Sequence, residues 1–290
     1  MNIVKAENLT CPIDGEPLAC HNKQMQCPQG HAFDIARQGY VNLLPVQHKR
    51  SKHPGDSKEM VLARTHFLNS GVYKIIADKL AELTCAQVSN NSAACILDAG
   101  CGEGYYLNVI FDYLASAAGE TRCSFIGLDI SKPAIMAAAK RNQQISWIVG
   151  TNRQPPVAAA SVDSIICVFG FHSFDGFNEV LKSGGKIILV EPGPDHLIEL
   201  RKIIYSEVKK SEPADLSYLE EKGLFLFDKQ SLHFKTGLLN NEQINNLLLM
   251  TPHFYRATQQ GREAAENLQQ LDLTVDVVVR VLEKKNIQPL

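Results

Sequence analysis

The stretch I-L-D-A-G-C-G-E-G over residues 96–104 limits the possible folds more than any other part of the chain. An apolar run that ends in Asp98 is typical of a buried parallel strand, and the glycines after it are typical of a turn into a helix. Glycine at such a turn lets the backbone approach a ligand at the carboxyl end of the strand. The free helix N-terminus that follows favours a negatively charged group, such as a carboxylate.

Strands and helices alternate through the rest of the chain. The apolar patterns predict strands over 95–100, 124–130, 146–151, 161–170, 186–192, 232–238 and 273–283. Helical spacing predicts helices over 60–84 (broken at Asn69-Ser70-Gly71), 105–116, 132–142, 177–185, 195–210 and 241–250. This order predicts an α/β fold with a Rossmann-like, doubly wound sheet.

The ligand of the glycine turn is expected to contain an adenosine. The turn reads G-x-G-x-G, and Tyr105 stands where the dinucleotide motif would place its third glycine. No lysine follows in the manner of a phosphate-binding loop, which disfavours a nucleoside triphosphate. The next strand ends in Asp129, 25 residues after Gly104, where an acid can accept both ribose hydroxyls. A glycine-rich turn without a ligand is the alternative for the motif taken alone.

The amino-terminal segment carries possible zinc ligands on two short knuckles. Cys27 and His31 supply one knuckle, C-x3-H, and Cys11 begins the other. Residue 14 would complete a C-x2-C pair, but it is Asp14, whose carboxylate can also ligate zinc. The segment therefore predicts a zinc-ribbon-like domain with zinc held by Cys11, Asp14, Cys27 and His31.

Other arrangements of this segment remain open. Cys20 or His21 could replace Asp14 if the loop folded back, or the thiols could lack a metal altogether. Without metal, so short a segment would have little core to keep it folded.

The organisation of the chain suggests three parts. Residues 1–46 form the ribbon-like domain, 47–92 a basic connector with a helical segment, and 93–290 the ligand-binding domain. The connector Q-H-K-R-S-K-H contains Lys49, Arg50 and Lys52, which could contact phosphates, although such a run is more often a solvated surface. The net charge of −2 excludes a protein that coats nucleic acid through bulk charge.

Neither a membrane span nor a secretory signal is expected from the sequence. No apolar run reaches the roughly 18 residues that a span needs. The start M-N-I-V-K-A-E-N lacks a basic region leading into an apolar one. We therefore expect a cytoplasmic protein whose eight cysteines are reduced thiols or metal ligands.

The glycine turn together with G-L-D-I-S over 127–131 resembles the class I S-adenosylmethionine-dependent methyltransferases. The resemblance implies that the strand-end acid and the glycines surround the methionine part of the cofactor, that Asp129 binds its ribose, and that Thr151-Asn152 contact adenine. The residues implied around methionine are Asp98, Gly100, Gly102 and Gly104.

The whole chain resembles the 23S rRNA guanine-N1 methyltransferases of the RlmA type. The resemblance rests on the ribbon-like start, on the block F-D-I-A-R-Q-G-Y-V-N-L-L-P over 33–45 with its continuation to 60, and on E-P-G-P-D-H-L-I-E-L over 191–200. It implies an RNA-recognition domain that binds zinc, a homodimer and an rRNA hairpin as partner. It places Tyr73, Gly102, Glu103 and His196 at cofactor-contact positions, and Asp14 at a zinc position where the family has Cys.

One turn departs from the family pattern. Where relatives carry Tyr/Phe-Ala/Ser-Pro, this chain has F-G-F-H over 169–172, and it has no N-P-P-Y motif, which disfavours methylation of an adenine or glutamine amino group. Guanine N1 carries a proton that must be removed, and His172, Glu191 and Asp195 are candidates for the base. Each also has a structural explanation, so no catalytic residue is assigned. Phe169, Phe171 and Phe174 could stack on an extruded base or belong to the core.

Two other functions remain possible at this stage. The acceptor could be a small molecule, or the chain could bind RNA or cofactor without transferring a methyl group. The family block and the basic connector favour rRNA.

Overall fold

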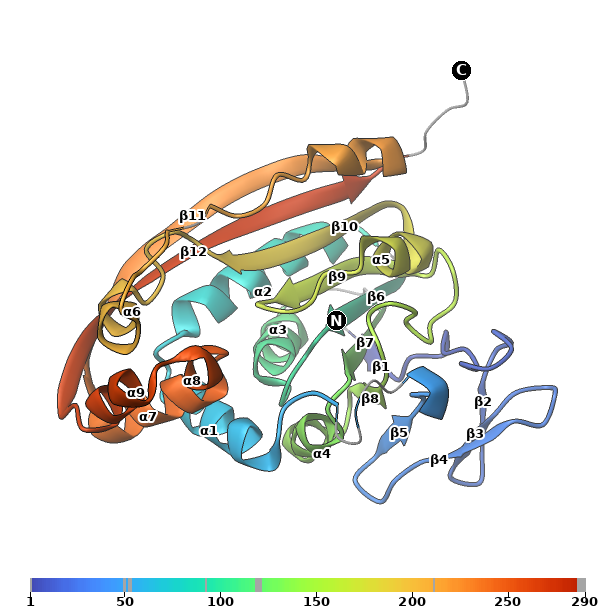
Figure 1. Ribbon diagram of the computed structural model, residues 1–290. Helices are drawn as coiled ribbons and strands as arrows, with labels where there is room; N and C mark the ends of the chain where they lie inside the picture. The colour runs from blue at the N-terminus through green and yellow to red at the C-terminus, as the bar shows by residue number, and fades with distance from the viewer. Residues whose placement is uncertain are drawn as a thin grey trace.

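The computed structural model describes residues 2–48, 51, 54–91, 93–117, 122–210 and 212–285. A nine-stranded sheet forms its centre, and a three-stranded sheet projects beside it (Figure 1). The strand order is β11-β12-β10-β9-β6-β7-β8-β5, and β1 pairs with β7 off this path. The predicted α/β, Rossmann-like fold with an amino-terminal ribbon is confirmed.

The strands of the large sheet have these bounds: β1 (Asn2–Val4), β5 (Tyr40–Asn42), β6 (Ala93–Ala99), β7 (Arg122–Asp129), β8 (Ser146–Val149), β9 (Val162–Val168), β10 (Leu181–Pro192), β11 (Leu224–Asn240) and β12 (Gln270–Lys284). All neighbouring pairs from β5 to β10 are parallel, and β12 runs antiparallel to both β10 and β11. The parallel strands therefore end at one edge, where α/β folds bind ligands.

The described helices are α1 (Lys58–Asn69), α2 (Lys74–Val88), α3 (Tyr105–Ser116), α4 (Lys132–Arg141), α5 (Phe174–Val180), α6 (Ile198–Ile204), α7 (Asn241–Met250), α8 (His253–Arg256) and α9 (Gln259–Glu266), with 3-10 turns η1 (Val46–His48) and η2 (Ser217–Lys222). Helices α7, α8 and α9 come between β11 and β12 in the sequence. In space they lie near α1, at the lower left of Figure 1. None of the helices in the described ranges is long and apolar enough to cross a membrane.

Two buried clusters cover opposite faces of the sheet. Ile96 belongs to a cluster with α1, α2, α3, α4 and α7, whereas the next residue, Leu97, belongs to a cluster with α5 and η2. The second cluster also includes Leu9, Leu18 and Val41 of the ribbon segment. The amino-terminal segment is thus packed into the same core as the sheet.

The ribbon itself is a short antiparallel sheet. Its strands are β2 (Ala19–His21), β3 (Gln24–Gln26) and β4 (Ala32–Asp34). Two further contacts join the segment to the large sheet, because Tyr40–Asn42 pair in parallel with β8 and Leu9 forms a bridge with Val157. The predicted domain boundaries at 46 and 92 stay predictions.

Two predicted helices were partly wrong. Helix 177–185 ends at Val180, because Leu181 already pairs with Val162 in the sheet. Helix 195–210 ends at Ile204, because the chain turns back there and the Arg201 guanidinium donates to the Lys209 carbonyl oxygen at 2.6 Å. The cationic connector residues Lys49, Arg50, Lys52 and His53 lie outside the described residues.

Candidate active site

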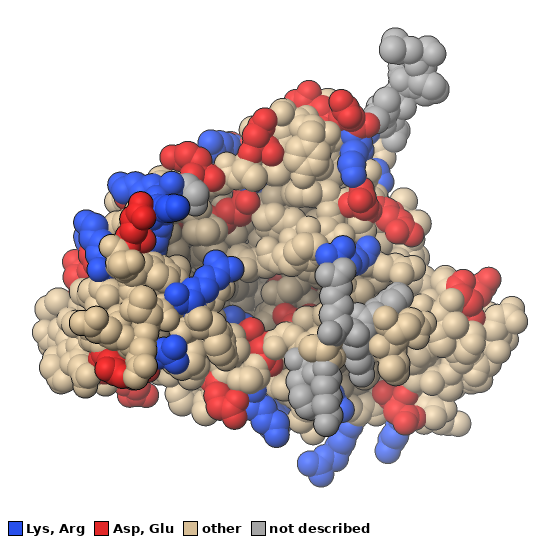
Figure 2. Space-filling view, in the orientation of Figure 1, with Lys and Arg blue, Asp and Glu red and all other residues tan. Residues whose placement is uncertain are grey.

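A cavity of about 770 Å³ opens at the carboxyl ends of the parallel strands. Figure 2 shows it as a hollow in the face of the molecule, with Lys and Arg side chains on its rim. Its wall includes residues from the glycine turn, the loop after β8, the turn after β9, the end of β10 and the helical cap of α1 and α8. This is the place that the sequence predicted for a cofactor.

The glycine turn is held by hydrogen bonds to the neighbouring strand. The backbone N–H groups of Gly100 and Cys101 donate to the Leu128 carbonyl oxygen at 2.7 and 3.0 Å. Gly100, Gly102 and Gly104 have φ values of +88°, +56° and +83°, which side chains rarely tolerate. The first two glycines line the cavity, and the third does not.

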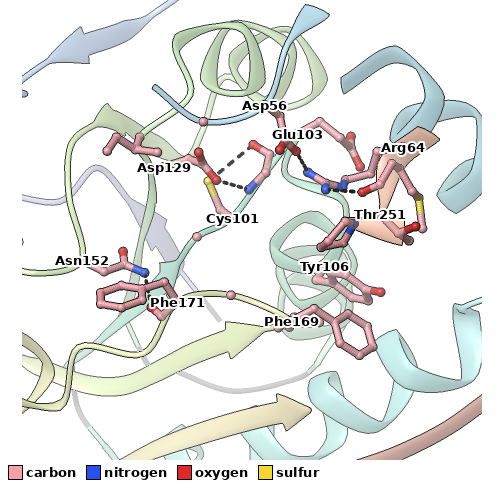
Figure 3. A pocket seen from close by; sticks show the side chains of 18 of the residues that line it. Asp56, Arg64, Cys101, Glu103, Tyr106, Asp129, Asn152, Phe169, Phe171 and Thr251 are labelled. Carbon is pink, nitrogen blue, oxygen red and sulfur yellow. Dashed lines mark hydrogen bonds and ion pairs between the residues drawn. The ribbon is translucent and has the colours of Figure 1, made fainter. Parts of the chain in front are cut away.

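Asp129 orders this turn from the end of β7. One carboxylate oxygen accepts from the Gly102 N–H at 2.9 Å and the other from the Ser131 N–H at 2.8 Å, as Figure 3 shows for the first. Burial raises its pKa, and the two N–H donors oppose that rise. The carboxylate lines the cavity where the sequence predicted a ribose-binding acid.

Two further acids lie buried at the turn. Asp98 lies outside the cavity wall, and burial together with the charge of Asp129 raises its pKa to about 8. Its Oδ2 is buried without a hydrogen-bond partner among the described residues, as is Oε1 of Glu103. The Arg141 guanidinium pairs with the other Glu103 oxygen. These unused buried oxygens suit a cofactor that carries positive charge.

The opposite part of the wall is aromatic. The ring centroids of Phe169 and His196 lie 5.5 Å apart, and Tyr73 lies 6.2 Å from Phe169 and 6.3 Å from His196. Burial lowers the pKa of His196 to about 4, so its imidazole is neutral at neutral pH. Asn152 lines the cavity from the loop after β8, and its side-chain amide donates to the Phe171 carbonyl oxygen at 3.0 Å (Figure 3).

The structure brings most of the predicted cofactor residues together. Seven of the nine line the cavity: Tyr73, Gly100, Gly102, Glu103, Asp129, Asn152 and His196. Asp98 and Gly104 do not line it. For Gly104 the reason is packing, because an added Cβ would lie 2.7 Å from the Trp147 ring.

Another part of the wall is formed by residues 169–172, the turn whose sequence differs from the expected family pattern. Phe169 has a left-handed backbone with φ +51°, and Phe169 and Phe171 remain 40% and 57% exposed. The Arg153 guanidinium lies 4.9 Å from the Phe171 ring centroid. Phe174 does not line the cavity. Its ring centroid lies 6.3 Å from that of Phe177 and 5.7 Å from that of His172, and it packs, partly buried, against the second core cluster.

The three candidate bases separate in the structure. His172 and Glu191 both line the cavity. Asp195 does not, and its carboxylate pairs with Lys210 at 2.5 Å. Asp195 is therefore part of an ion pair outside the cavity wall.

A set of contacts made by Arg64 in the cavity wall was not predicted. Arg64 of α1 pairs with Asp56 of the connector and donates to the Met250 carbonyl oxygen at 3.0 Å, as Figure 3 shows. Arg256 and His253 of α8 also line the wall. No local sequence signal distinguishes these residues from other polar residues on helices, because their partners lie far away in the chain.

The predicted zinc ligands converge within the ribbon. The ligand atoms of Cys11, Asp14, Cys27 and His31 all lie within 4.8 Å of one another. His31 Nδ1 is 3.6 Å from Cys11 Sγ and 3.5 Å from Cys27 Sγ. A tetrahedral zinc with ordinary Zn–S and Zn–N bonds separates sulfur and nitrogen by about 3.5 Å.

Asp14 occupies the fourth corner of this cluster. Its Oδ2 is 3.2 Å from Cys27 Sγ and 2.8 Å from His31 Nδ1, and its Oδ1 accepts from the Glu16 N–H at 3.0 Å. Cys20 is exposed on β2, and neither it nor His21 belongs to the cluster. The donor set and its sulfur–nitrogen distances fit zinc, and Asp14 supplies a carboxylate in place of a thiolate.

Two family models match separate parts of the chain. The model described as RlmA, N-terminal, matches residues 9–52, and the model described as methyltransferase domain matches residues 96–185. The first match contains all four zinc-site residues, and the second contains the glycine turn.

Curated relatives match over longer stretches. A Bacillus subtilis (strain 168) protein with the provisional name 23S rRNA (guanine-N(1)-)-methyltransferase YxjB is 30% identical over 93% of this chain and 95% of its own length. A provisionally named 23S rRNA (guanine-N(1)-)-methyltransferase of Micromonospora griseorubida is 35% identical over 67% of this chain and 68% of its own. The 23S rRNA (guanine(748)-N(1))-methyltransferase of Streptomyces fradiae is 32% identical over 66% of each chain. The chain therefore belongs to the RlmA-type family of 23S rRNA (guanine-N1)-methyltransferases.

Proposed function

We propose that this protein transfers a methyl group from S-adenosylmethionine to N1 of a guanine in a 23S rRNA hairpin. The observation that carries the proposal is the similarity to YxjB over 95% of that relative's length, which includes both the ribbon and the methyltransferase sheet. A small-molecule acceptor would not explain why the chain carries an RlmA-type ribbon.

The cofactor would lie across the glycine turn. Asp129 would hold the ribose hydroxyls, Asn152 would lie near the adenine, and Gly100 and Gly102 would leave room for the backbone to approach the ligand. Asp98 and Glu103 would balance the positive charge of the cofactor, with Tyr73 and His196 on the aromatic side and Gly104 behind the turn. When bound, S-adenosylmethionine supplies an electrophilic methyl group on a sulfonium.

The target base would enter between the exposed rings of the turn after β9. Phe169 and Phe171 line the cavity and remain partly exposed, as a stacking surface for an extruded base requires. Arg153 beside Phe171 and Arg256 of α8 would attract the flanking phosphates. Positioning supplies much of the acceleration in such an in-line displacement.

The ribbon of residues 1–46 would recognise the RNA, with zinc held by Cys11, Asp14, Cys27 and His31. The connector of residues 47–92 would reach toward the phosphates, and residues 93–290 would bind the cofactor. A homodimer in the cytoplasm would present both ribbons to the hairpin.

The proposal is tested by transfer of label from S-adenosylmethionine to unmodified 23S rRNA, with 16S rRNA and a set of small amines and phenols as comparisons. Label in 23S rRNA alone is expected, because the ribbon would select an rRNA. Label in a small molecule would support the alternative acceptor. Cofactor binding without transfer to any acceptor would support a non-enzymatic relative.

A further inference from the structure

Glu191, Arg280 and His172 form a charged cluster beside the aromatic turn. Glu191 lies near the end of β10, and Arg280 comes from the adjacent antiparallel strand β12. The register pairs Glu191 with Val278, so Arg280 lies two residues along on the same face of the sheet. His172 follows β9, and both His172 and Glu191 line the cavity.

Arg280 holds only one oxygen of the Glu191 carboxylate. Its Nε donates to Oε2 at 2.7 Å, and its Nη2 donates to the same oxygen. Its Nη1 donates to the Ala214 carbonyl oxygen at 2.6 Å, which fixes the guanidinium. His172 Nδ1 lies 4.0 Å from Oε1, too far for a hydrogen bond. Oε1 therefore has no donor among the residues that the structure describes.

His172 is the other candidate base on this part of the wall. Its Nε2 is buried without a hydrogen-bond partner in the described ranges. Burial lowers the pKa of the imidazole, with a smaller opposing contribution from Glu191. Because the His172 imidazole is neutral, Arg280 remains the cation that pairs with the Glu191 carboxylate. The other titratable group that interacts with Glu191 is the Cys167 thiol of β9, whose pKa burial raises.

We propose that Glu191 is the general base for the reaction and that Arg280 is its positioning residue. The inference rests on the proposed function, because it assumes a guanine whose N1 must lose a proton. A carboxylate held at one oxygen by a buried guanidinium has a fixed direction, and its free oxygen can accept the N1–H.

The guanine N1–H bond breaks with its electron pair left on N1, and Glu191 Oε1 takes the proton. The N1–CH₃ bond then forms from that pair as the S–CH₃ bond breaks, with its electrons left on sulfur. Glu191 afterwards releases the proton to water, so each turnover yields one methylated guanine, one S-adenosylhomocysteine and one proton.

The test is single-turnover methylation of unmodified 23S rRNA with cofactor and RNA both saturating. Glu191→Gln should lower the rate constant by about 100-fold or more, because it removes the base and keeps the size of the side chain. The loss should shrink as pH rises, because hydroxide can then remove the N1 proton in place of Glu191. The matched control is Asp195→Asn, a nearby acid outside the cavity, which should keep the wild-type rate.

Two further variants distinguish a loss of the base from a loss of folding. Glu191→Asp keeps the charge for Arg280 but shortens the reach, so it should be slow and retain the wild-type pH dependence. Arg280→Lys should lower the same rate constant while the cofactor dissociation constant stays unchanged. A wild-type rate in Glu191→Gln, or a loss confined to cofactor or RNA binding, would overturn the inference. If the wild-type enzyme itself makes no 1-methylguanosine, the proposed function fails and takes the inference with it.

Discussion

Asp98 links the buried charge of the glycine turn to cofactor binding. With its pKa raised to about 8 by burial and by the charge of Asp129, the carboxyl is largely protonated at neutral pH. A cationic ligand favours the ionised form, so binding should release a proton. Affinity linked to proton release rises with pH below the pKa of the free protein and levels off above it.

We therefore expect S-adenosylmethionine to bind more tightly as the pH rises toward about 8. Calorimetric titration in buffers of different ionisation enthalpy would measure both the affinity and the released proton. Asp98→Asn removes the titrating group. The variant should bind S-adenosylmethionine more weakly, and its affinity should no longer rise with pH toward about 8. Equal pH dependence in the two proteins would contradict this role.

Asp14 gives a second prediction at the residue scale. Asp14→Cys completes a C-x2-C knuckle, and because thiolate is a softer zinc ligand than carboxylate, zinc should be held about 10-fold or more tightly. Competition with a coloured chelator measures the affinity. Cys20→Ser, which changes an exposed thiol outside the cluster, is the matched control and should leave the affinity unchanged.

The glycine turn is the element that most directly joins fold and site, and two of its glycines should respond differently to alanine. At Gly104 a Cβ would lie 2.7 Å from the Trp147 ring and 3.0 Å from Ala138 Cβ, so Gly104→Ala should cost about 1–3 kcal/mol of unfolding free energy. Gly102 also has a positive φ, so alanine strains the backbone at both positions. At Gly102, however, the nearest atom is Arg64 Nη1 at 3.4 Å, so the added methyl group has no comparable clash and the variant should lose less stability. Denaturant unfolding should separate the two variants.

The order of the two glycine variants should reverse when cofactor affinity is measured in place of stability. Gly102→Ala should weaken S-adenosylmethionine binding more than Gly104→Ala does, after correction for the folded fraction. A Gly104 variant as stable as the wild type, or a Gly102 variant with normal affinity, would show that the packing argument is wrong.

Elements with local signals could be predicted from the sequence. Helix α7 occupies the predicted residues 241–250, and Asn240 and Gln243 form a capping box at its start. Leu181 could not be predicted as the start of a strand, because its pairing with Val162 is a tertiary contact. The same holds in the site, since Asp129 is marked by its place after a strand, whereas Arg280 meets Glu191 only through the packing of β12 against β10.

At the scale of the whole molecule, the ribbon and the catalytic sheet share a core. Strand β5 pairs with β8, and Leu9, Leu18 and Val41 pack with Leu97 in one cluster. The cofactor cavity lies at the ends of the parallel strands, and the zinc cluster lies apart from it in the ribbon. Metal loss should therefore disturb the ribbon first and leave the cavity in place.

We expect chelation of zinc to abolish rRNA methylation while S-adenosylmethionine binding persists. The two readouts are label transfer and cofactor titration on the same chelated sample. Restored transfer after zinc is returned would exclude irreversible unfolding. Loss of cofactor binding together with methylation would show that the shared core depends on the metal.

The most direct test of the account is the identity of the methylated nucleoside. Unmodified 23S rRNA treated with this protein and S-adenosylmethionine would be digested to nucleosides and fragments, and the product located by mass spectrometry against methylguanosine standards. We expect 1-methylguanosine at one guanine of one hairpin. Methylation at another atom, or unmodified rRNA despite bound cofactor, would contradict it.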